Sequence, residues 1–371
     1  MFNAVLIDLL KIGLVVFALL QVGAILTWVE RKQSAAMQDR IGPNRADIFG
    51  LTVLGLFHPI ADGIKMLTKE DFRPRGADPY LFPLAPVLAF APAVIAFAVI
   101  PWGGTLRFGE GPDTWFVPLR IADINVGILF IFAVVSISVY GVVLAGWASA
   151  NKWSLLGGLR AASQMLSYEV SMGLSAMGVF MVFESLRLSQ IAVGQGELIF
   201  GFIPKWGIVV QPLGFILFMT AAIAEAKRVP FDIPEGESEI VAGYFTEYSG
   251  MKFGMFFLGE FVEVVLASAL ITTLFLGSYQ IPFVVADQAR NLYGLQLPGA
   301  ELWPWNANLV AILQALAFVF KVSVMIFILQ TIRWTLPRFR YDQVMNLGWK
   351  MMFPLALANL LITAFLILAL S

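Results

Sequence analysis

The residues best suited to acid–base chemistry are gathered in one acidic segment, residues 225–250, which begins EAKRVPFDIPEGESE. Its carboxylates are Glu225, Asp232, Glu235, Glu237, Glu239 and Glu247. Pro230 and Pro234 each remove a backbone donor, so we expect the segment to interrupt the helices on either side. Carboxylates that lie close together raise one another's pKa, and a carboxylate that is to take up a proton at neutral pH needs a raised pKa. The alternative interpretation is a solvated loop with ordinary surface charge.

The surroundings of this segment are strongly apolar. The chain has 371 residues, of which 59% are hydrophobic and 13% charged, and its mean hydropathy is +0.82. No water-soluble core needs so much apolar sequence, so the composition predicts an all-α, polytopic membrane protein with one membrane domain, residues 1–371. The formal net charge of −1 gives no reason to expect nucleic-acid binding. The first apolar run lacks a basic start and a small-residue cleavage site, so we expect it to be retained as a span.

Several residue types that build cofactor sites are missing. The chain has no cysteine and a single histidine, His58. Iron–sulfur clusters need thiolate ligands and a bis-histidine haem needs two imidazoles, so neither is expected here. No phosphate-binding loop or dinucleotide fingerprint occurs either. We therefore expect no metal and no cofactor bound by this chain alone, and any redox chemistry must use electrons carried by another chain.

The apolar runs predict about eight transmembrane helices, each long enough to cross a bilayer. The predicted spans lie near 5–28, 81–101, 126–148, 163–183, 207–226, 253–276, 307–332 and 351–370. Most lysines and arginines fall in the loops after the first, third, fifth and seventh spans. The positive-inside rule places those loops in the cytoplasm and both termini outside. The long loops 29–80 and 227–252, and with them the acidic segment, are then cytoplasmic.

The first long loop is expected to contain an interfacial amphipathic helix that starts near Pro59. His58, Asp62, Lys65 and Lys69 share its polar face, opposite an apolar face that includes Ile60, Ile64 and Leu67. Upstream, Glu30 stands beside Arg31 and Asp39 beside Arg40, which favours paired polar groups that line a site over simple lipid anchoring. For His58 a structural role at the helix start is the preferred interpretation.

Ionisable residues also lie within the predicted spans, where they are costly and usually functional. They are Glu169 in the fourth span, Glu260 and Glu263 in the sixth, and Lys321 in the seventh. Glu260 and Glu263 share one helix face, so at least one should hold a proton near neutrality. Lys321 is a natural counter-charge for one of these acids, although the sequence does not say which. A proton-conducting network is favoured over polar groups that merely join helices.

Four long motifs resemble those of one family, the H subunit of NADH–quinone oxidoreductase, which is respiratory complex I in bacteria. The first motif lies in the first loop and has four parts: VERK at 29–32, QDRIGPNR at 38–45, PIADGIK at 59–65 and TKED at 68–71. The second motif is LRAASQMLSYE at 159–169, the third AEAKRVPFDIPEGESEIVAGYFTEY at 224–248, and the fourth RFRYDQ at 338–343. They occur in the family's order through nearly the whole chain.

The resemblance implies a quinone chamber between this chain and the peripheral arm of the complex. Residues at positions that the family places along the chamber are Glu30, Arg31, Arg40, Asp62, Glu235, Glu237, Glu239 and Glu247. Those that match its proton relay are Glu169, Glu225 and Glu260, to which the intramembrane pattern adds Glu263 and Lys321. His58 and Glu263 depart from the family's pattern, since glutamine is usual at the first position and no acid is expected at the second.

The residues and the resemblance together predict a subunit that couples quinone reduction to proton translocation in a bacterial inner membrane. Quinone is then a substrate, and FMN and the iron–sulfur clusters are expected in partner subunits. The expected partners are peripheral-arm subunits over the cytoplasmic loops, small neighbouring membrane subunits and the lipid bilayer. Two alternatives stay open at this point: the membrane anchor of an energy-converting hydrogenase that uses no quinone, and a self-contained secondary transporter.

Overall fold

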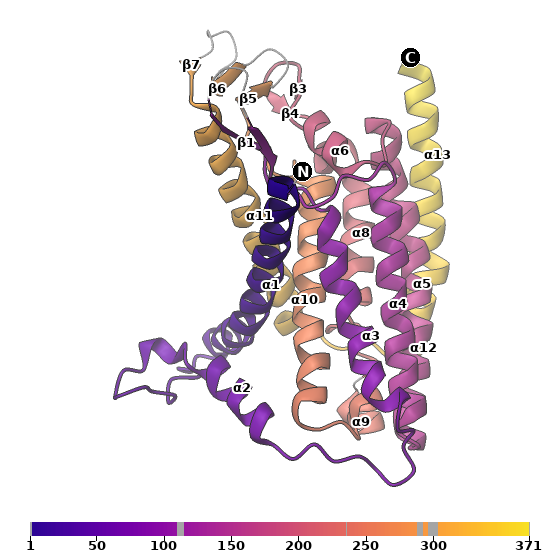
Figure 1. The fold of residues 1–371 in the computed structure, drawn as a ribbon. Coiled ribbons are helices and arrows are strands. Elements are labelled where there is room, and N and C mark those ends of the chain that lie inside the picture. The colour runs from indigo at the N-terminus through magenta and orange to yellow at the C-terminus, as the bar shows by residue number, and fades with distance from the viewer. Residues whose placement is uncertain (1, 110–114, 235, 288–291, 296–302, 371) are drawn as a thin grey trace.

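The computed structural model describes residues 2–109, 115–234, 236–287, 292–295 and 303–370, and in these ranges the chain is mainly helical (Figure 1). The main helices are α1 (Phe2–Met37), α3 (Leu81–Ala96), α4 (Gly127–Ala148), α5 (Lys152–Phe183), α8 (Pro212–Glu225), α10 (Gly250–Phe275), α11 (Ala307–Thr335) and α13 (Phe353–Leu370). The shorter ones are α2 (His58–Thr68), α6 (Leu188–Gly194), α7 (Gly207–Val210), α9 (Glu237–Ile240) and α12 (Tyr341–Asn346). A π-helical turn, Leu347–Met352, joins α12 to α13.

Three small antiparallel sheets, which an all-α prediction does not include, lie in the loops at the end of the molecule that holds both termini (Figure 1). They are formed by β1 (Thr105–Phe108) with β2 (Trp115–Pro118), by β3 (Leu198–Ile199) with β4 (Ile203–Pro204), and by β5 (Val284–Asp287), β6 (Leu292–Leu295) and β7 (Trp303–Pro304). They tie loops together without contributing to the helical core.

Seven of the described helical segments are long and apolar enough to cross a membrane, and each corresponds to a predicted span. The fifth predicted span, 207–226, differs because it is divided into α7 and α8 at Gln211. The break has a local cause: Pro212 disfavours helical geometry at the residue before it, and Gln211 takes φ −133° and ψ 61°. α8 alone has 14 residues and is therefore only about 21 Å long, shorter than a typical span.

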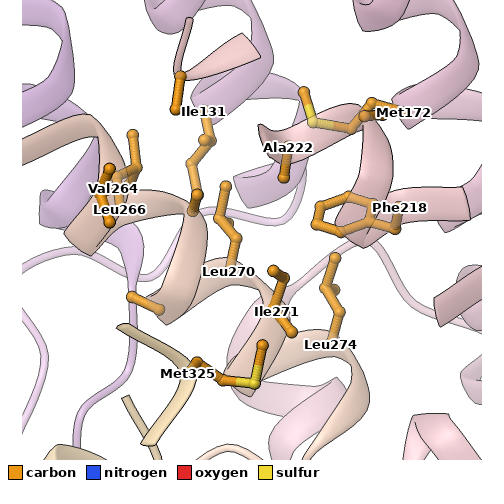
Figure 2. Packing of buried hydrophobic residues seen from close by; sticks show 14 of the residues in the cluster. Ile131, Met172, Phe218, Ala222, Val264, Leu266, Leu270, Ile271, Leu274 and Met325 are labelled. Carbon is orange, nitrogen blue, oxygen red and sulfur yellow. The ribbon is translucent and has the colours of Figure 1, made fainter. Parts of the chain in front are cut away.

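Helix α10 lies at the centre of the bundle. Of its most apolar stretch 72% is buried, against 17% for α1 at the edge of the molecule. Figure 2 shows its side chains Leu266, Leu270 and Leu274 among Phe218 and Met172 of the neighbouring helices. Because α10 is enclosed by protein, any charged group on it must find its counter-charge within the chain.

The two ends of the bundle differ in character. Both termini lie at one end, whereas α2, α9 and α12 lie at the other (Figure 1). The acidic segment and the first long loop therefore share an end of the molecule, as the charge distribution predicts. That this end faces the cytoplasm stays a prediction.

The predicted amphipathic helix is α2, which begins at His58 with a proline in its first turn. It contacts α1 and α10 and contains no buried residue. Its apolar side chains Ile60, Ile64 and Leu67 are all more than half exposed, so this chain leaves an apolar helix face uncovered.

Candidate functional site

Glu225 is the last residue of α8 and lies inside the bundle, where the acidic segment begins. Its side chain is buried, and neither carboxylate oxygen has a hydrogen-bond partner among the described residues. It lines a cavity of about 30 Å³ between α4, α5, α8 and α10, which is large enough for a water molecule. Ile131, Met172 and Phe218 form apolar walls of this cavity (Figure 2).

Glu263 of α10 lines the same cavity and forms a buried ion pair. The Nζ of Lys227 donates to both carboxylate oxygens of Glu263, at 2.9 and 3.1 Å. Burial disfavours the charged lysine, but the carboxylate of Glu263 outweighs burial and holds the pKa of Lys227 above its ordinary value. The counter-charge for the acids of the sixth span therefore comes from the acidic segment itself.

Glu260 and Glu169 complete the group of buried or half-buried acids. Glu260 lies one turn before Glu263 on α10, and the hydroxyl of Tyr244 donates to its Oε1 at 3.5 Å. Glu169 lies on α5 and accepts a short hydrogen bond from the hydroxyl of Ser136 on α4. Both carboxylates thus keep a hydroxyl contact, whereas Glu225 has none among the residues that the structure describes.

A cluster of charged residues connects α1, the acidic segment and α11. Glu30 is buried on α1 and accepts from Arg228 at 2.6 Å, while Arg333 approaches its other oxygen at 2.7 Å. The guanidinium of Arg228 also stacks 4.3 Å from the ring centroid of Phe261. One carboxylate between two arginines leaves this cluster with a net positive charge, which suits an anionic ligand.

Arg31 continues this polar surface toward α2, because its guanidinium lies 2.7 Å from a carboxylate oxygen of Asp62. Both side chains are partly exposed, so the pair contributes little to stability and remains accessible to a ligand. Arg40 is exposed and donates to Gln38 at 2.7 Å and to Ser34 at 3.3 Å. Contrary to our expectation, Glu30 and its neighbour in sequence Arg31 do not pair with each other; each pairs with a residue from another part of the chain.

Apart from Glu225, the acids of the segment whose side chains the structure describes each have a partner from a different element. Asp232 pairs with Arg338 at 2.5 Å, Glu239 with Arg160 at 2.6 Å, and Glu247 accepts from Asn151 at 2.6 Å. Burial raises the pKa of Asp232 to about 6, although Arg338 opposes this rise. The contacts of Glu239 with Arg160 and of Glu247 with Asn151 join the segment to the start of α5. Glu235 and the side chain of Glu237 lie outside the described residues.

The comparisons with known proteins bear directly on these residues. The sequence model of the NADH dehydrogenase family matches residues 10–364. An H subunit of NADH-quinone oxidoreductase from Geobacter metallireducens is 47% identical over 363 residues, which cover 98% of this chain and 97% of that protein. The H subunit from Bdellovibrio bacteriovorus is 43% identical over 377 residues, with 96% and 95% covered.

The chain belongs to the H subunit family of NADH-quinone oxidoreductase. This confirms the resemblance of the four motifs and makes the chain a multi-pass membrane subunit of complex I, with other complex I subunits as its partners. As a subunit of NADH-quinone oxidoreductase, the chain is neither the hydrogenase anchor nor the self-contained transporter that the sequence left open.

In this H subunit, the contacts of Lys321 differ from our expectation that it would pair with an acid. Its Nζ donates to the backbone carbonyls of Leu276, Ser278 and Gln280 at 2.7, 3.0 and 2.7 Å. Among the described residues no carboxylate lies within ion-pair distance of it, and its ammonium stacks 4.4 Å from the ring centroid of Trp206. The lysine binds the carbonyl end of α10, where a helix attracts positive charge, instead of meeting an acid.

Sequence reasoning missed the cations that organise this site. Lys227, Arg228 and Arg338 all lie in the family motifs, yet only their acidic neighbours were predicted to act there. Their positions within the motifs were an available signal, but their partners come from distant elements and could not be paired from one sequence. For His58 the preferred structural role agrees with the structure, because its Nδ1 lies 2.8 Å from the carbonyl oxygen of Gly55 at the start of α2.

No group of three or more metal-binding side chains occurs within the described ranges. The chain as a whole contains no cysteine and one histidine, so it cannot supply the thiolate ligands of an iron–sulfur cluster. The carboxylates, lysine and arginines of the site can transfer protons and respond to nearby charge.

Proposed function

We propose that this chain forms part of the quinone passage of complex I and the first part of its proton relay. Glu225 carries this proposal, because it is a buried carboxylate without a hydrogen-bond partner among the described residues, placed where the acidic segment enters the bundle. An ionised carboxylate is costly in such a setting, so a group there exchanges its proton when the charge nearby changes.

The acids around Glu225 support a relay. Its carboxylate interacts electrostatically with Glu169 on α5 and with Glu263 on α10. Glu260, one turn from Glu263, interacts with Asp232 of the acidic segment. Carboxylates from three helices and from the segment thus influence one another's charge, so a proton gained or lost at one site changes the proton affinity of the others.

The charged surface formed by α1, α2 and the acidic segment supports the quinone passage. Glu30, Arg228 and Arg333 lie at its inner end, Arg31 and Asp62 farther out toward α2. The uncovered apolar face of α2 adjoins it and suits an isoprenoid tail. Arg40, Glu239 and Glu247, with Glu235 and Glu237, are proposed to complete the wall where the peripheral arm docks.

Electrons are proposed to arrive from an iron–sulfur cluster in a docked soluble subunit, with FMN farther along the same arm. Reduction of a quinone takes two electrons and two protons, so each turnover changes the charge beside the acidic segment. The segment is proposed to face the bacterial cytoplasm, with both termini on the other side of the membrane.

The test is Glu225→Gln in the assembled complex, with proton translocation and quinone reduction measured in sealed membrane vesicles. The variant keeps the shape of the side chain but cannot exchange a proton, so proton translocation should fall by about 100-fold or more, as for loss of a general acid–base group. Glu197→Gln is the matched control, because Glu197 is exposed at the opposite end and pairs with Lys205. Wild-type translocation in Glu225→Gln would refute the relay.

A further inference from the structure

Lys227 stands at an unusual backbone position directly after α8. Its φ of 53° lies in the left-handed region, where a helix end usually has glycine. The amide of Lys227 bonds to the carbonyl of Ala224, and that of Arg228 to the carbonyl of Ile223, so the chain turns sharply there. Lysine at this position has a backbone cost that glycine would not have, so the contacts of its side chain have to offset that cost.

The side chain of Lys227 is enclosed between the acidic segment and α10. It is 3% exposed and its partner Glu263 is 9% exposed, so water cannot screen either charge effectively. Both carboxylate oxygens of Glu263 face the ammonium group, at 2.9 and 3.1 Å. The geometry is that of a fully formed ion pair.

Glu225 competes for the same positive charge. It precedes Lys227 by two residues, lines the same small cavity as Glu263 and interacts electrostatically with Lys227. The other charged groups that act on this trio are Glu169 from α5, Glu260 from α10 and Arg228. One lysine therefore faces two buried carboxylates, and it donates to only one of them.

We propose that Lys227 is a positioning residue that keeps Glu263 ionised and so leaves Glu225 as the acid that takes up the proton. Glu263 and Lys227 together are electrically neutral, which removes the repulsion that Glu263 alone would exert on an ionised Glu225. The inference rests on the proposed relay and gives its two neighbouring acids different tasks: Glu263 holds a fixed charge, and Glu225 exchanges protons.

The test compares Lys227→Gln, Glu263→Gln and the double variant in vesicles that contain the whole complex. The measured quantity is the pH at which proton translocation per quinone reduced falls to half on the alkaline side. Glu263→Gln releases the ammonium group to Glu225 and favours its ionised form, so the half-point should move to lower pH by about one unit or more. Lys227→Gln removes the positive charge and lets both acids hold protons, so the half-point should move to higher pH.

The double variant separates this role from simple packing. It removes both charges of a neutral pair, so the half-point should return to the wild-type pH even if the rate is lower. Lys227→Arg keeps the charge and should also keep the half-point. If a single variant does not assemble, the half-point of the double variant decides. Three results would overturn the proposal. The half-points of the two single variants could move in the same direction, neither could move, or the half-point of the double variant could differ from that of the wild type.

Glu225→Gln in the same assay distinguishes failure of the proton relay from failure of the role proposed for Lys227. If that variant translocates protons normally, the relay itself is wrong. If it loses translocation while the Lys227 and Glu263 variants leave the half-point unmoved, only the division of tasks between the acids is wrong.

Discussion

At the scale of single residues, Asp232 shows how a buried acid can respond to pH near neutrality. Its pKa rises to about 6 from an ordinary value of 3.8 because burial disfavours the carboxylate, while Arg338 partly offsets the effect. A raised carboxyl pKa contributes stability below the unfolded pKa, and that contribution is lost as pH rises from about 4 to about 6. The loss is on the order of 3 kcal/mol.

Arg338→Gln should move the pH range over which this stability is lost to higher pH. Without the guanidinium, the pKa of Asp232 should rise above 6, because its carboxylate loses the charge-assisted hydrogen bond from Arg338. Thermal inactivation of the complex, followed between pH 5 and pH 8, should then become steeper above pH 6. Arg340→Gln, a neighbouring exposed arginine, is the control. An unchanged pH profile in Arg338→Gln would show that Arg338 does not hold the charge of Asp232.

Sequence identified most of the acids but not their partners. Glu225, Glu260 and Glu263 could be found because acids are conspicuous in apolar runs. Asp232 and Glu239 do not face other acids of the segment, because each meets an arginine from another element. Such pairs join residues far apart in the chain, and only the packing of the helices brings them together.

At the scale of elements, Lys321 joins α11 to the end of α10. Its three carbonyl acceptors follow the last turn of α10, and Gly277 between them takes a φ of 77° with the indole of Trp206 against it. A side chain at Gly277 would overlap that ring. The arrangement fixes the carbonyl end of the central helix, whose middle carries Glu260 and Glu263.

Lys321→Met should therefore destabilise the complex without a specific effect on proton translocation. Loss of hydrogen bonds from a charged donor costs roughly 1.5–3 kcal/mol each, so thermal inactivation should occur several degrees lower. Lys205→Met is the control, since its exposed pair with Glu197 should be worth at most about 1 kcal/mol. Normal thermal stability with lost translocation would instead place Lys321 in the relay.

The elements themselves were largely predictable, because length and hydropathy define a span. Several helices differ in extent from the spans predicted for them, and two of these differences have a clear cause. α1 continues through Glu30 and Arg31 to Met37, since a helix can extend beyond the membrane where hydropathy no longer detects it. The fifth span is broken at Gln211, where Pro212 interrupts an apolar run that looks continuous by composition.

At the scale of the whole molecule, the two ends differ in the residues that they carry. The end with α2 and α9 collects the described acids of the segment and their arginine partners, whereas the end with both termini carries small sheets and the Lys321 contacts (Figure 1). Between them, α10 is the connecting element, with Glu260 and Glu263 inside the bundle. In the relay that we propose, a charge change at the first end reaches the interior through contacts such as that of Lys227 with Glu263.

A photoreactive quinone analogue in the assembled complex tests the central claim most directly. The account predicts that label displaced by excess quinone will be found in this chain, on peptides that contain Arg31 or Asp62 and on peptides of the segment 225–250. Competable label confined to other subunits, or to residues 101–109 and 277–287 at the opposite end, would contradict it.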